Sequence, residues 1–525
     1  MSFSKVYSAQ ANLVRATIIS VEIDLSKGLN SFSIVGLPDK AVEESKDRMS
    51  AAIKNSGYVS PKSKNQKVVV SLAPADIKKE GPSFDVPMAL AYLLASDDIR
   101  FDPEGKLFLG EVSLDGRLRA IPGVLPLARE AELQKFKEIY VPAANAKEAA
   151  LISGITVFGA ETLKDIIDHV NKKKESVELL DSEDQPQRIK TKLIPQPQTE
   201  IHLQNILPEI DFRDIHGQEG AKRGLEIAAA GGHNIAMYGP PGTGKTMLAK
   251  AFCHLLPQLS FDEMLEVTSI HSVAGNLTGD IISKPPFRSP HHTASYISIV
   301  GGGSFPKPGE ITLAHRGVLF MDEFPEFDRQ VIDALRQPLE DHVVTISRAR
   351  GTSTFPAQVM LVVAMNPCPC GYHGIAGRSC SCSPHALARY HRRISGPIID
   401  RIDLWTEVSV INHQSLSEHI SSAQTTDHIK KKVGDARTIQ TERFKNHPRS
   451  IKTNSEMNAR DIPIYIVLDA EAKKVLTSSA ERMNLSGRAH HRLMKIARTI
   501  ADLSKKEIVD IEAILEALQY RPKRA

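Results

Sequence analysis

The stretch GPPGTGKT, residues 239 to 246, decides the fold of the segment around it. An apolar run, Ile235 to Tyr238, precedes it, and the helix-forming sequence MLAKAFCHLL follows it. A glycine-rich turn therefore joins a buried strand to the N-terminus of a helix, which is the setting of a phosphate-binding loop. The backbone N–H groups of such a turn and the start of the helix both attract phosphate oxygens. The pattern predicts a nucleotide-binding protein.

Each residue of this loop has an expected contact with ATP. The glycines let the backbone curl around a polyphosphate, Lys245 reaches the β- and γ-phosphates, and the Thr246 hydroxyl takes a Mg²⁺ position. The expected nucleotide-binding residues are Gly239, Pro240, Pro241, Gly242, Thr243, Gly244, Lys245 and Thr246.

Two further apolar strands end in polar side chains suited to ATP hydrolysis. GVLFMDE ends in Asp322 and Glu323, and VMLVVAMN ends in Asn366. A nucleotide bound at the C-terminal ends of parallel strands has its γ-phosphate near these residues. We expect Asp322 to hold Mg²⁺ through water and Glu323 to deprotonate the attacking water. Asn366 would hydrogen-bond the γ-phosphate or that water, so the sequence predicts a Mg²⁺-dependent ATPase.

Length and composition limit the remaining choices. The chain has 525 residues, of which 41% are hydrophobic, 24% charged and 5% aromatic, as in an ordinary α/β protein of several domains. It has no apolar run of about 18 residues and no signal pattern at its N-terminus, so we expect a cytoplasmic protein without a membrane partner. The net charge of +4 permits nucleic-acid binding without demonstrating it.

The order of patterns predicts four segments. Residues 1–170 mix strand and helix patterns, and 171–205 are polar, charged and proline-containing, as in a flexible linker. Residues 206–410 alternate strands and helices around the phosphate loop, which favours a parallel sheet. Residues 411–525 are almost free of strand patterns and read as a helical lid.

Four of the five cysteines lie close together in the sequence. Cys368, Cys370, Cys380 and Cys382 form two Cys-x-Cys pairs, and four thiols closing a short loop suit tetrahedral coordination of Zn²⁺. His373 or His385 are alternatives for one of the sulfurs, and reduced structural cysteines are the alternative to zinc. Cys253, in the helix after the phosphate loop, reads as a small buried residue.

Several long blocks resemble one family. They are PFRSPHHTAS (286–295), VGGGSFPKPGEITLAHRGVLFMDEFPEF (300–327), AMNPCPCGY (364–372), RYHRRISGPIIDRIDL (389–404) and ARTIADL (497–503). With the phosphate loop they resemble the Mg-chelatase-like branch of the AAA+ ATPases, and within it the ComM/YifB family. The resemblance implies a hexameric ring helicase acting on single-stranded and branched DNA, which promotes branch migration when transforming DNA is integrated in natural competence. The alternative is a chelatase-type motor subunit that remodels a protein partner.

The resemblance also assigns arginines. Arg401 resembles the arginine finger that reaches a neighbouring subunit's γ-phosphate, with Arg392 and Arg393 as competing candidates, and Arg488 resembles the sensor 2 arginine of the lid. An exposed surface charge is the alternative for each of them.

VVTISRARGTSTF (343–355) predicts a hairpin with Arg348 and Arg350 near its tip. It resembles the presensor 1 hairpin, which implies that the two arginines face the pore of a ring and contact the DNA backbone. The alternative is a surface hairpin whose charges are incidental.

The N-terminal segment resembles the Lon protease fold. KKEGPSFDVPMALAYLLA matches the segment of the catalytic serine, and GEVSLDGRLRAIPGVLPLAREA that of the catalytic lysine. Ser83 stands at the nucleophile position, but Leu125 stands at the lysine position and has no group that accepts a proton. The resemblance implies a Lon-like α+β domain without peptidase activity, which assists ring assembly or contacts DNA.

Overall fold

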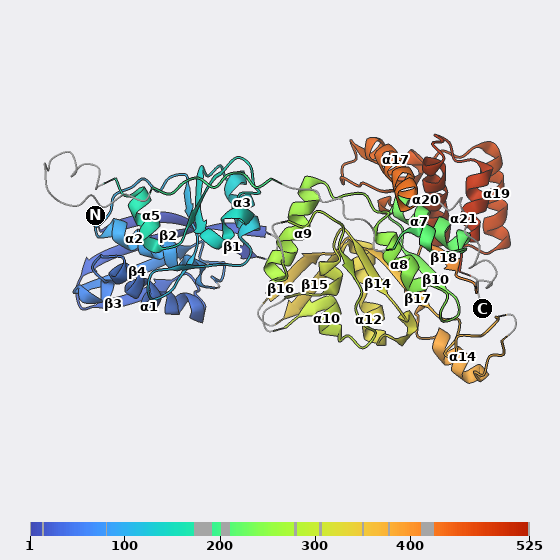
Figure 1. Ribbon diagram of the computed structural model, residues 1–525, viewed down its shortest axis with the longest axis horizontal. Helices are drawn as coiled ribbons and strands as arrows, with labels where there is room; N and C mark the ends of the chain where they lie inside the picture. Colours follow the sequence, from blue (N-terminus) through green and yellow to red (C-terminus); the bar gives the residue numbers. More distant parts are fainter. Residues whose placement is uncertain are drawn as a thin grey trace. The chain divides into compact units, whose positions relative to one another are not determined.

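The computed structural model describes residues 2–12, 15–79, 81–172, 192–200, 210–277, 281–303, 307–348, 351–375, 378–410 and 425–522. They form two compact units, one of Met1–Leu203 with Thr268–Ile282 and one of Gln204–Val267 with Ser283–Ala525 (Figure 1). Most of the predicted linker, 171–205, lies outside the described residues.

The first unit is built on a seven-stranded mixed sheet in the order β3-β4-β2-β1-β5-β8-β9. These strands are β1 (Phe3–Asn12), β2 (Arg15–Lys27), β3 (Ser31–Val35), β4 (Gln66–Ala73), β5 (Lys106–Phe108), β8 (Glu138–Pro142) and β9 (Thr156–Ala160), and a separate small ladder joins β6 (Glu111–Val112) to β7 (Leu118–Arg119). The helices are α1 (Lys40–Asn55), α2 (Asp85–Ala95), α3 (Val124–Leu133), α4 (Ala146–Ala149) and α5 (Leu163–Val170). Every second residue of β4 is buried, and α2 is buried on nearly all sides, so this helix lies in the centre of the unit.

The second unit contains a five-stranded parallel sheet in the order β11-β14-β17-β10-β18. Its strands are β10 (Ile235–Tyr238), β11 (Phe287–Arg288), β14 (Val318–Met321), β17 (Met360–Met365) and β18 (Leu404–Glu407). Around it lie α7 (Glu219–Gly231), α8 (Lys245–Cys253), α10 (Tyr296–Val300), α11 (Glu310–Leu313), α12 (Arg329–Ala334), α13 (Arg336–Asp341), α14 (Pro384–His391) and α15 (Gly396–Ile399). Helix α9 (Phe261–Ala274) has residues in both units, and short ladders join β12 (Gly301–Gly302) to β13 (Lys307–Pro308) and β15 (Val343–Arg348) to β16 (Gly351–Pro356).

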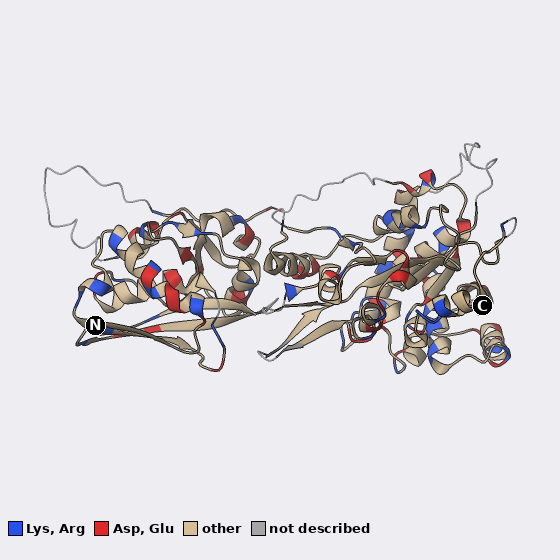
Figure 2. Ribbon diagram, turned by 90° about the horizontal axis from the view of Figure 1, so that it is seen from below, with Lys and Arg blue, Asp and Glu red and all other residues tan. Residues whose placement is uncertain are grey.

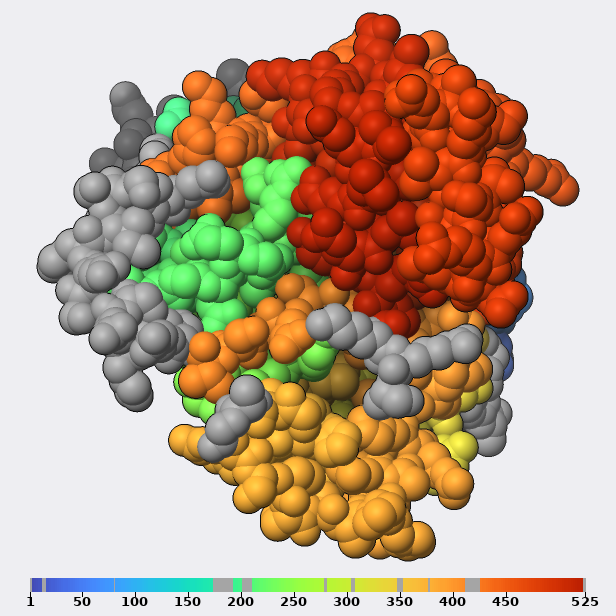
Figure 3. Space-filling model, turned by 90° about the vertical axis from the view of Figure 1, so that its right-hand side faces the viewer, coloured from blue at the N-terminus to red at the C-terminus, as the bar shows by residue number. Residues whose placement is uncertain are grey.

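The C-terminal part of the second unit is helical, with α17 (Thr426–Phe444), α18 (Ile462–Tyr465), α19 (Ala470–Arg482), α20 (Gly487–Leu503) and α21 (Ile511–Gln519). Figure 3 shows these helices beside the segment that carries α7 and α8. One apolar core includes Leu225 of α7, Met237 of β10, Val433 of α17 and Ile500 of α20. The helices are therefore packed onto the ATPase core as a lid, and the predicted fold class is confirmed.

The ARTIADL block forms a buried ionic network inside the lid. Arg498 is 1% exposed and donates to Asp502 at 3.1 Å, and Arg443 of α17 donates to the same carboxylate at 2.8 Å. The buried Arg498 and the partly buried Arg443 share one buried carboxylate, which holds α20 against α17. Loss of the carboxylate would leave both charges without it.

The distribution of charge and of apolar residues was compared across the two units. Figure 2 shows Lys and Arg interspersed with Asp and Glu in both units, so the positive charge is not confined to either. Among the described residues, no helix is both long and apolar enough to span a bilayer.

Candidate active site

Parallel pairing brings three loops to one edge of the sheet in the second unit. Tyr238 lies opposite Met365, and Met321 lies opposite Val363 on the other side of β17. The residues that follow these strands are the phosphate loop after β10, Asp322 after β14 and Asn366 after β17. The edge therefore presents one lysine, one hydroxyl, two carboxylates and one amide together.

The phosphate loop has the backbone that its glycines predict. Gly242 and Gly244 have φ of 77° and 88°, in the left-handed region that glycine adopts at little cost. A Cβ at either position would meet nothing within 4 Å, so the loop is open at these positions. Helix α8 begins at Lys245, immediately after the second of these glycines.

Lys245 is held at the centre of the site. Its Nζ donates to the carbonyls of Gly239 and Pro240, both at 2.8 Å, and to Oδ1 of Asn366 at 3.2 Å. Burial lowers the pKa of this ammonium, and the charge of Asp322 partly opposes the shift. The carbonyls of the loop thus accept the hydrogen bonds that phosphate oxygens would accept from Lys245 in the presence of ATP. The side-chain amide of Asn366, at the end of β17, contacts the same Nζ atom.

Thr246 and Asp322 form the pair expected of a Mg²⁺ site. The Thr246 hydroxyl donates to Oδ2 of Asp322 at 2.7 Å. The backbone N–H of Glu323 donates to Oδ1 of the same carboxylate at 2.9 Å, which fixes its orientation. Hydroxyl and carboxylate oxygens are the ligands that Mg²⁺ uses beside phosphates, so these residues fit a Mg²⁺–nucleotide complex.

Glu323 stands beside this pair in an uncommon conformation. Its φ is 50°, which costs a non-glycine residue about 1 kcal/mol or more and is concentrated at functional sites. Its side chain is 54% exposed, and Oε2 lies 3.0 Å from Nδ1 of His292. The ring of His291 lies 4.1 Å from that of His292. Sequence reasoning did not single out His292: the block PFRSPHHTAS contained the signal, but nothing in it showed that the ring meets Glu323.

The two arginines assigned by resemblance share one carboxylate away from the phosphate loop. Arg401 pairs with Oε2 of Glu340 and donates to the carbonyl of Pro397 at 2.7 Å, and Arg488 lies 3.5 Å from Oε1 of Glu340. The Arg401 side chain is 15% exposed and that of Arg488 is 65% exposed. Among the described residues, neither arginine has an ion pair with Asp322 or Glu323, so the structure brings these two together at Glu340.

The competing finger candidates are placed differently. Arg393 donates to the carbonyl of Pro325 at 2.9 Å and pairs with Glu326, three residues after Glu323. Arg392 is the C-cap of α14.

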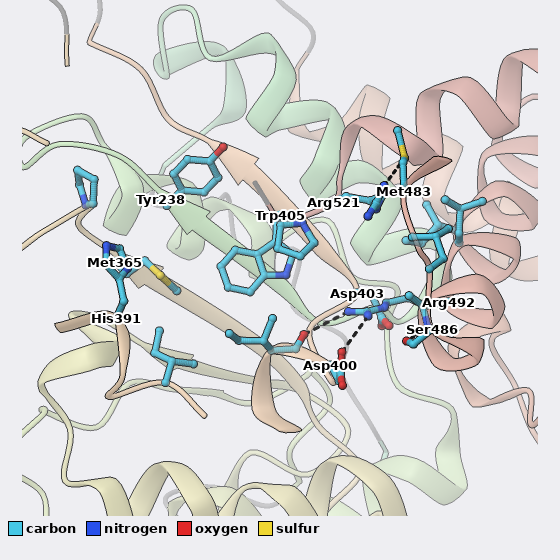
Figure 4. A pocket seen from close by; sticks show the side chains of 18 of the residues that line it. Tyr238, Met365, His391, Asp400, Asp403, Trp405, Met483, Ser486, Arg492 and Arg521 are labelled. Atoms are coloured by element: carbon cyan, nitrogen blue, oxygen red, sulfur yellow. Dashed lines mark hydrogen bonds and ion pairs between the residues drawn. The ribbon is translucent and has the colours of Figure 1, made fainter. Parts of the chain in front are cut away.

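The segment around Arg401 is held by buried groups. Nδ1 of the fully buried His233 lies 3.3 Å from Asp403, and the Asn234 amide donates to the carbonyl of Arg401 at 2.9 Å. Arg492 of the lid donates to the carbonyl of Ile402 at 2.5 Å. Arg492 also lies 3.6 Å from Oδ1 of Asp400 (Figure 4). Both residues line a cavity of about 750 Å³, together with Trp405 and Tyr238. These contacts tie the lid to the residues that precede β10 and β18, at the opposite ends of the parallel strands from Asn366.

The four clustered cysteines meet in space. Their Sγ atoms all lie within 4.8 Å of one another, and neither His373 nor His385 belongs to this group. All four are free thiols, and Cys253 is a partly buried free cysteine elsewhere.

Two other predicted sites remain, the arginines of the hairpin and the serine of the first unit. Arg350 and the side chain of Arg348 lie outside the described residues, although β15 and β16 form the predicted hairpin. In the first unit Ser83 lies before α2, and Leu125 is a buried residue of α3 with 1% exposure.

This arrangement defines the AAA+ class of P-loop proteins: a phosphate loop, an acidic pair and an amide follow neighbouring strands of a parallel sheet, and a helical lid packs beside them. Family models for "Magnesium chelatase, subunit ChlI", "Subunit ChlI of Mg-chelatase" and "Magnesium chelatase, subunit ChlI C-terminal" match residues 211–416, 21–145 and 423–521.

Curated relatives agree along the whole chain. "Competence protein ComM" of Haemophilus influenzae is 40% identical over 99% of this chain and 98% of its own length. "Uncharacterized protein YifB" of Escherichia coli is 40% identical over 99% and 97%. "Lon protease 2" of Bacillus subtilis is 30% identical over 26% of this chain and 26% of its own length. The chain belongs to the ComM/YifB family of Mg-chelatase-like AAA+ proteins, which implies ATP and Mg²⁺ as cofactors.

Proposed function

We propose that this protein is a cytoplasmic, ATP-driven AAA+ ring motor that acts on DNA as a helicase. In this proposal six copies form the ring, and the motor promotes branch migration on single-stranded and branched DNA during natural competence. The observation that carries it is the junction of Lys245, Asn366, Thr246 and Asp322 at one sheet edge, in a chain related over its full length to a competence protein.

The catalytic assignment follows from the contacts of these side chains. Lys245 exchanges its two carbonyl partners for β- and γ-phosphate oxygens, and Thr246 and Asp322 hold Mg²⁺, which neutralises phosphate charge when bound. Glu323 lies beside this pair and takes the proton of the attacking water. The Asn366 amide orients that water or the γ-phosphate. His292 contacts Glu323 and sets its direction before ATP binds.

We assign Arg401 to the γ-phosphate of a neighbouring subunit as an arginine finger, and Arg488 to the sensor 2 position of the lid. Both pair with Glu340, and among the described residues Arg401 has no ion pair with Asp322 or Glu323, which supports its action in trans. Assembly then replaces Glu340 by phosphate as the partner of these arginines. The mainly exposed Arg488 needs the smaller rearrangement, whereas Arg401 must leave a largely buried position.

We place Arg348 and Arg350 in the pore, where they contact the DNA backbone. The antiparallel ladder that pairs Val343 with Pro356 and Arg348 with Gly351 supports this, since it is the hairpin that the sequence predicts for these arginines. We further propose that Cys368, Cys370, Cys380 and Cys382 hold one structural Zn²⁺, because four thiols meet within 4.8 Å. The Lon-like domain has no peptidase role in this account, since Leu125 is buried and has no proton acceptor.

A chelatase-type motor that remodels a protein partner is the second candidate, favoured by the three family matches. ATP-dependent unwinding of forked and three-stranded DNA separates the two. We expect the wild-type protein to unwind both substrates and Glu323→Gln to unwind neither. ATP hydrolysis without unwinding, at a salt concentration low enough for DNA binding, would favour the chelatase-type motor instead.

A further inference from the structure

The sulfurs of the four clustered cysteines lie close enough together to share one metal ion. The Sγ atoms of Cys368 and Cys370 are 3.3 Å apart, those of Cys370 and Cys380 are 3.5 Å apart, and those of Cys368 and Cys380 are 3.8 Å apart. Tetrahedral Zn²⁺ with Zn–S bonds of about 2.3 Å requires sulfurs about 3.8 Å apart. The backbone N–H of His373 donates to the Cys368 sulfur at 3.3 Å, as amides around metal-bound thiolates do.

The cluster begins at Cys368, two residues after Asn366, the amide expected to contact the γ-phosphate or the attacking water. The side-chain oxygen of Asn366 accepts from Lys245 Nζ at 3.2 Å. Cys368 is fully buried. A metal at this sulfur therefore fixes the backbone immediately after Asn366, whose side-chain amide contacts Lys245.

The cluster is joined to the same residue at its end. Ser383, next to Cys382, caps α14 by accepting from the Ala386 N–H at 3.2 Å. Tyr390, at the other end of α14, donates its hydroxyl to the carbonyl of Asn366 at 3.1 Å. The chain thus leaves Asn366, passes through the four cysteines and returns to Asn366.

The cluster also touches the phosphate loop. Gly371 has φ of 84°, and a Cβ at this position would lie 2.5 Å from Cδ of Pro241. Only glycine fits between the cysteine pair and residue 241, so a displacement of this turn reaches the phosphate loop directly.

Little else holds this segment in place. Among the described residues from 367 to 383 there is no helix or strand, and backbone hydrogen bonds within it include Gly371 to Cys368 at 2.9 Å and Ile375 to Tyr372 at 3.3 Å. Four metal–sulfur bonds supply the restraint that secondary structure does not.

We propose that zinc held by these four cysteines fixes Asn366 and the phosphate loop, so that metal occupancy sets the rate of ATP hydrolysis. The inference rests on the proposed ATPase function. Asn366 acts on the reacting groups, whereas the cysteines and Tyr390 are positioning residues. Because the lysine and the loop amides still contact the phosphates, metal loss lowers kcat more than it weakens nucleotide binding.

The test begins with metal content and spectroscopy of the full chain purified without chelator. We expect about one zinc per chain, absent from a Cys380→Ser, Cys382→Ser double variant. Replacement by Co²⁺ should give the visible absorption of a tetrahedral thiolate site in the wild type. Cys253→Ser, the fifth cysteine, is the matched control and should keep both metal and activity. A stable, active wild type without metal would overturn the proposal.

The second arm measures kcat and nucleotide affinity in variants that differ in metal content. The double variant, which loses two of the four ligands, should lose about tenfold or more in kcat, while its Kd for ATP changes by less than about threefold. Gly371→Ala and Tyr390→Phe should keep the zinc and the Co²⁺ spectrum but lower kcat. Unchanged kcat in the metal-free double variant would overturn the coupling. A zinc-loaded wild type that hydrolyses no ATP would overturn the proposed function, and the inference with it.

Discussion

Removal of the Lys245 ammonium should weaken ATP binding by an amount that its contacts allow us to estimate. Nζ makes three hydrogen bonds, at 2.8, 2.8 and 3.2 Å, and two of them go to loop carbonyls that must be exchanged for phosphate oxygens. A hydrogen bond to a charged group contributes about 1.5–3 kcal/mol. Since the carbonyl partners are lost in the exchange, we count the net gain as one such bond, about 2–3 kcal/mol. Lys245→Ala should therefore weaken ATP binding about 30- to 150-fold.

The assay is titration calorimetry with a non-hydrolysable ATP analogue and Mg²⁺, beside ATPase rates. Lys250→Ala is the matched control, because Lys250 is an exposed lysine of the same helix. Lys245→Ala should lose both affinity and turnover, whereas the control keeps both. Equal affinity for the analogue in wild type and Lys245→Ala would refute the assignment of this lysine to the phosphates.

Three further changes test other parts of the account. Glu323→Gln should keep ATP binding and abolish turnover, and wild-type turnover in this variant would show that the base is another residue. Rings mixed from Arg401→Ala and Lys245→Ala subunits should recover activity only at interfaces where an intact Arg401 meets an intact Lys245 of the next subunit. A fully active monomer would exclude the action of Arg401 in trans. Asp502→Ala should lower the free energy of unfolding by about 3–5 kcal/mol, since it removes the carboxylate that pairs with the buried Arg498 and the partly buried Arg443. A melting temperature equal to that of the wild type would contradict the third expectation.

Local patterns were enough to predict the strands that carry the site. The apolar runs before Gly239, Asp322 and Asn366 are strands of one parallel sheet, as the sequence predicted, because a buried parallel strand is itself an apolar run bounded by polar residues. The hairpin at 343–356 was also predictable, from two strand-like halves around a turn.

Contacts between distant residues were not predictable in this way. Glu340 lies in α13, and nothing in its neighbourhood shows that Arg401 and Arg488, 61 and 148 residues away, share its carboxylate. His292 approaches Glu323 from a segment rich in Gly, Pro and Ser, where no periodicity fixes the direction of a side chain. The contact of Tyr390 with Asn366 was not predictable either, because α14 is short and its position depends on the cysteines before it. Such contacts arise from tertiary packing, which a one-dimensional pattern does not contain.

Coupling of ATP hydrolysis to DNA is tested by the ATPase rate with and without single-stranded DNA. The wild type is compared with an Arg348→Ala, Arg350→Ala double variant at several salt concentrations, because each neutralised phosphate releases counterions. We predict stimulation by DNA in the wild type and none in the double variant, with basal hydrolysis retained and a flatter salt dependence of binding. A wild-type rate that DNA leaves unchanged, at a salt concentration where DNA is bound, would contradict the account.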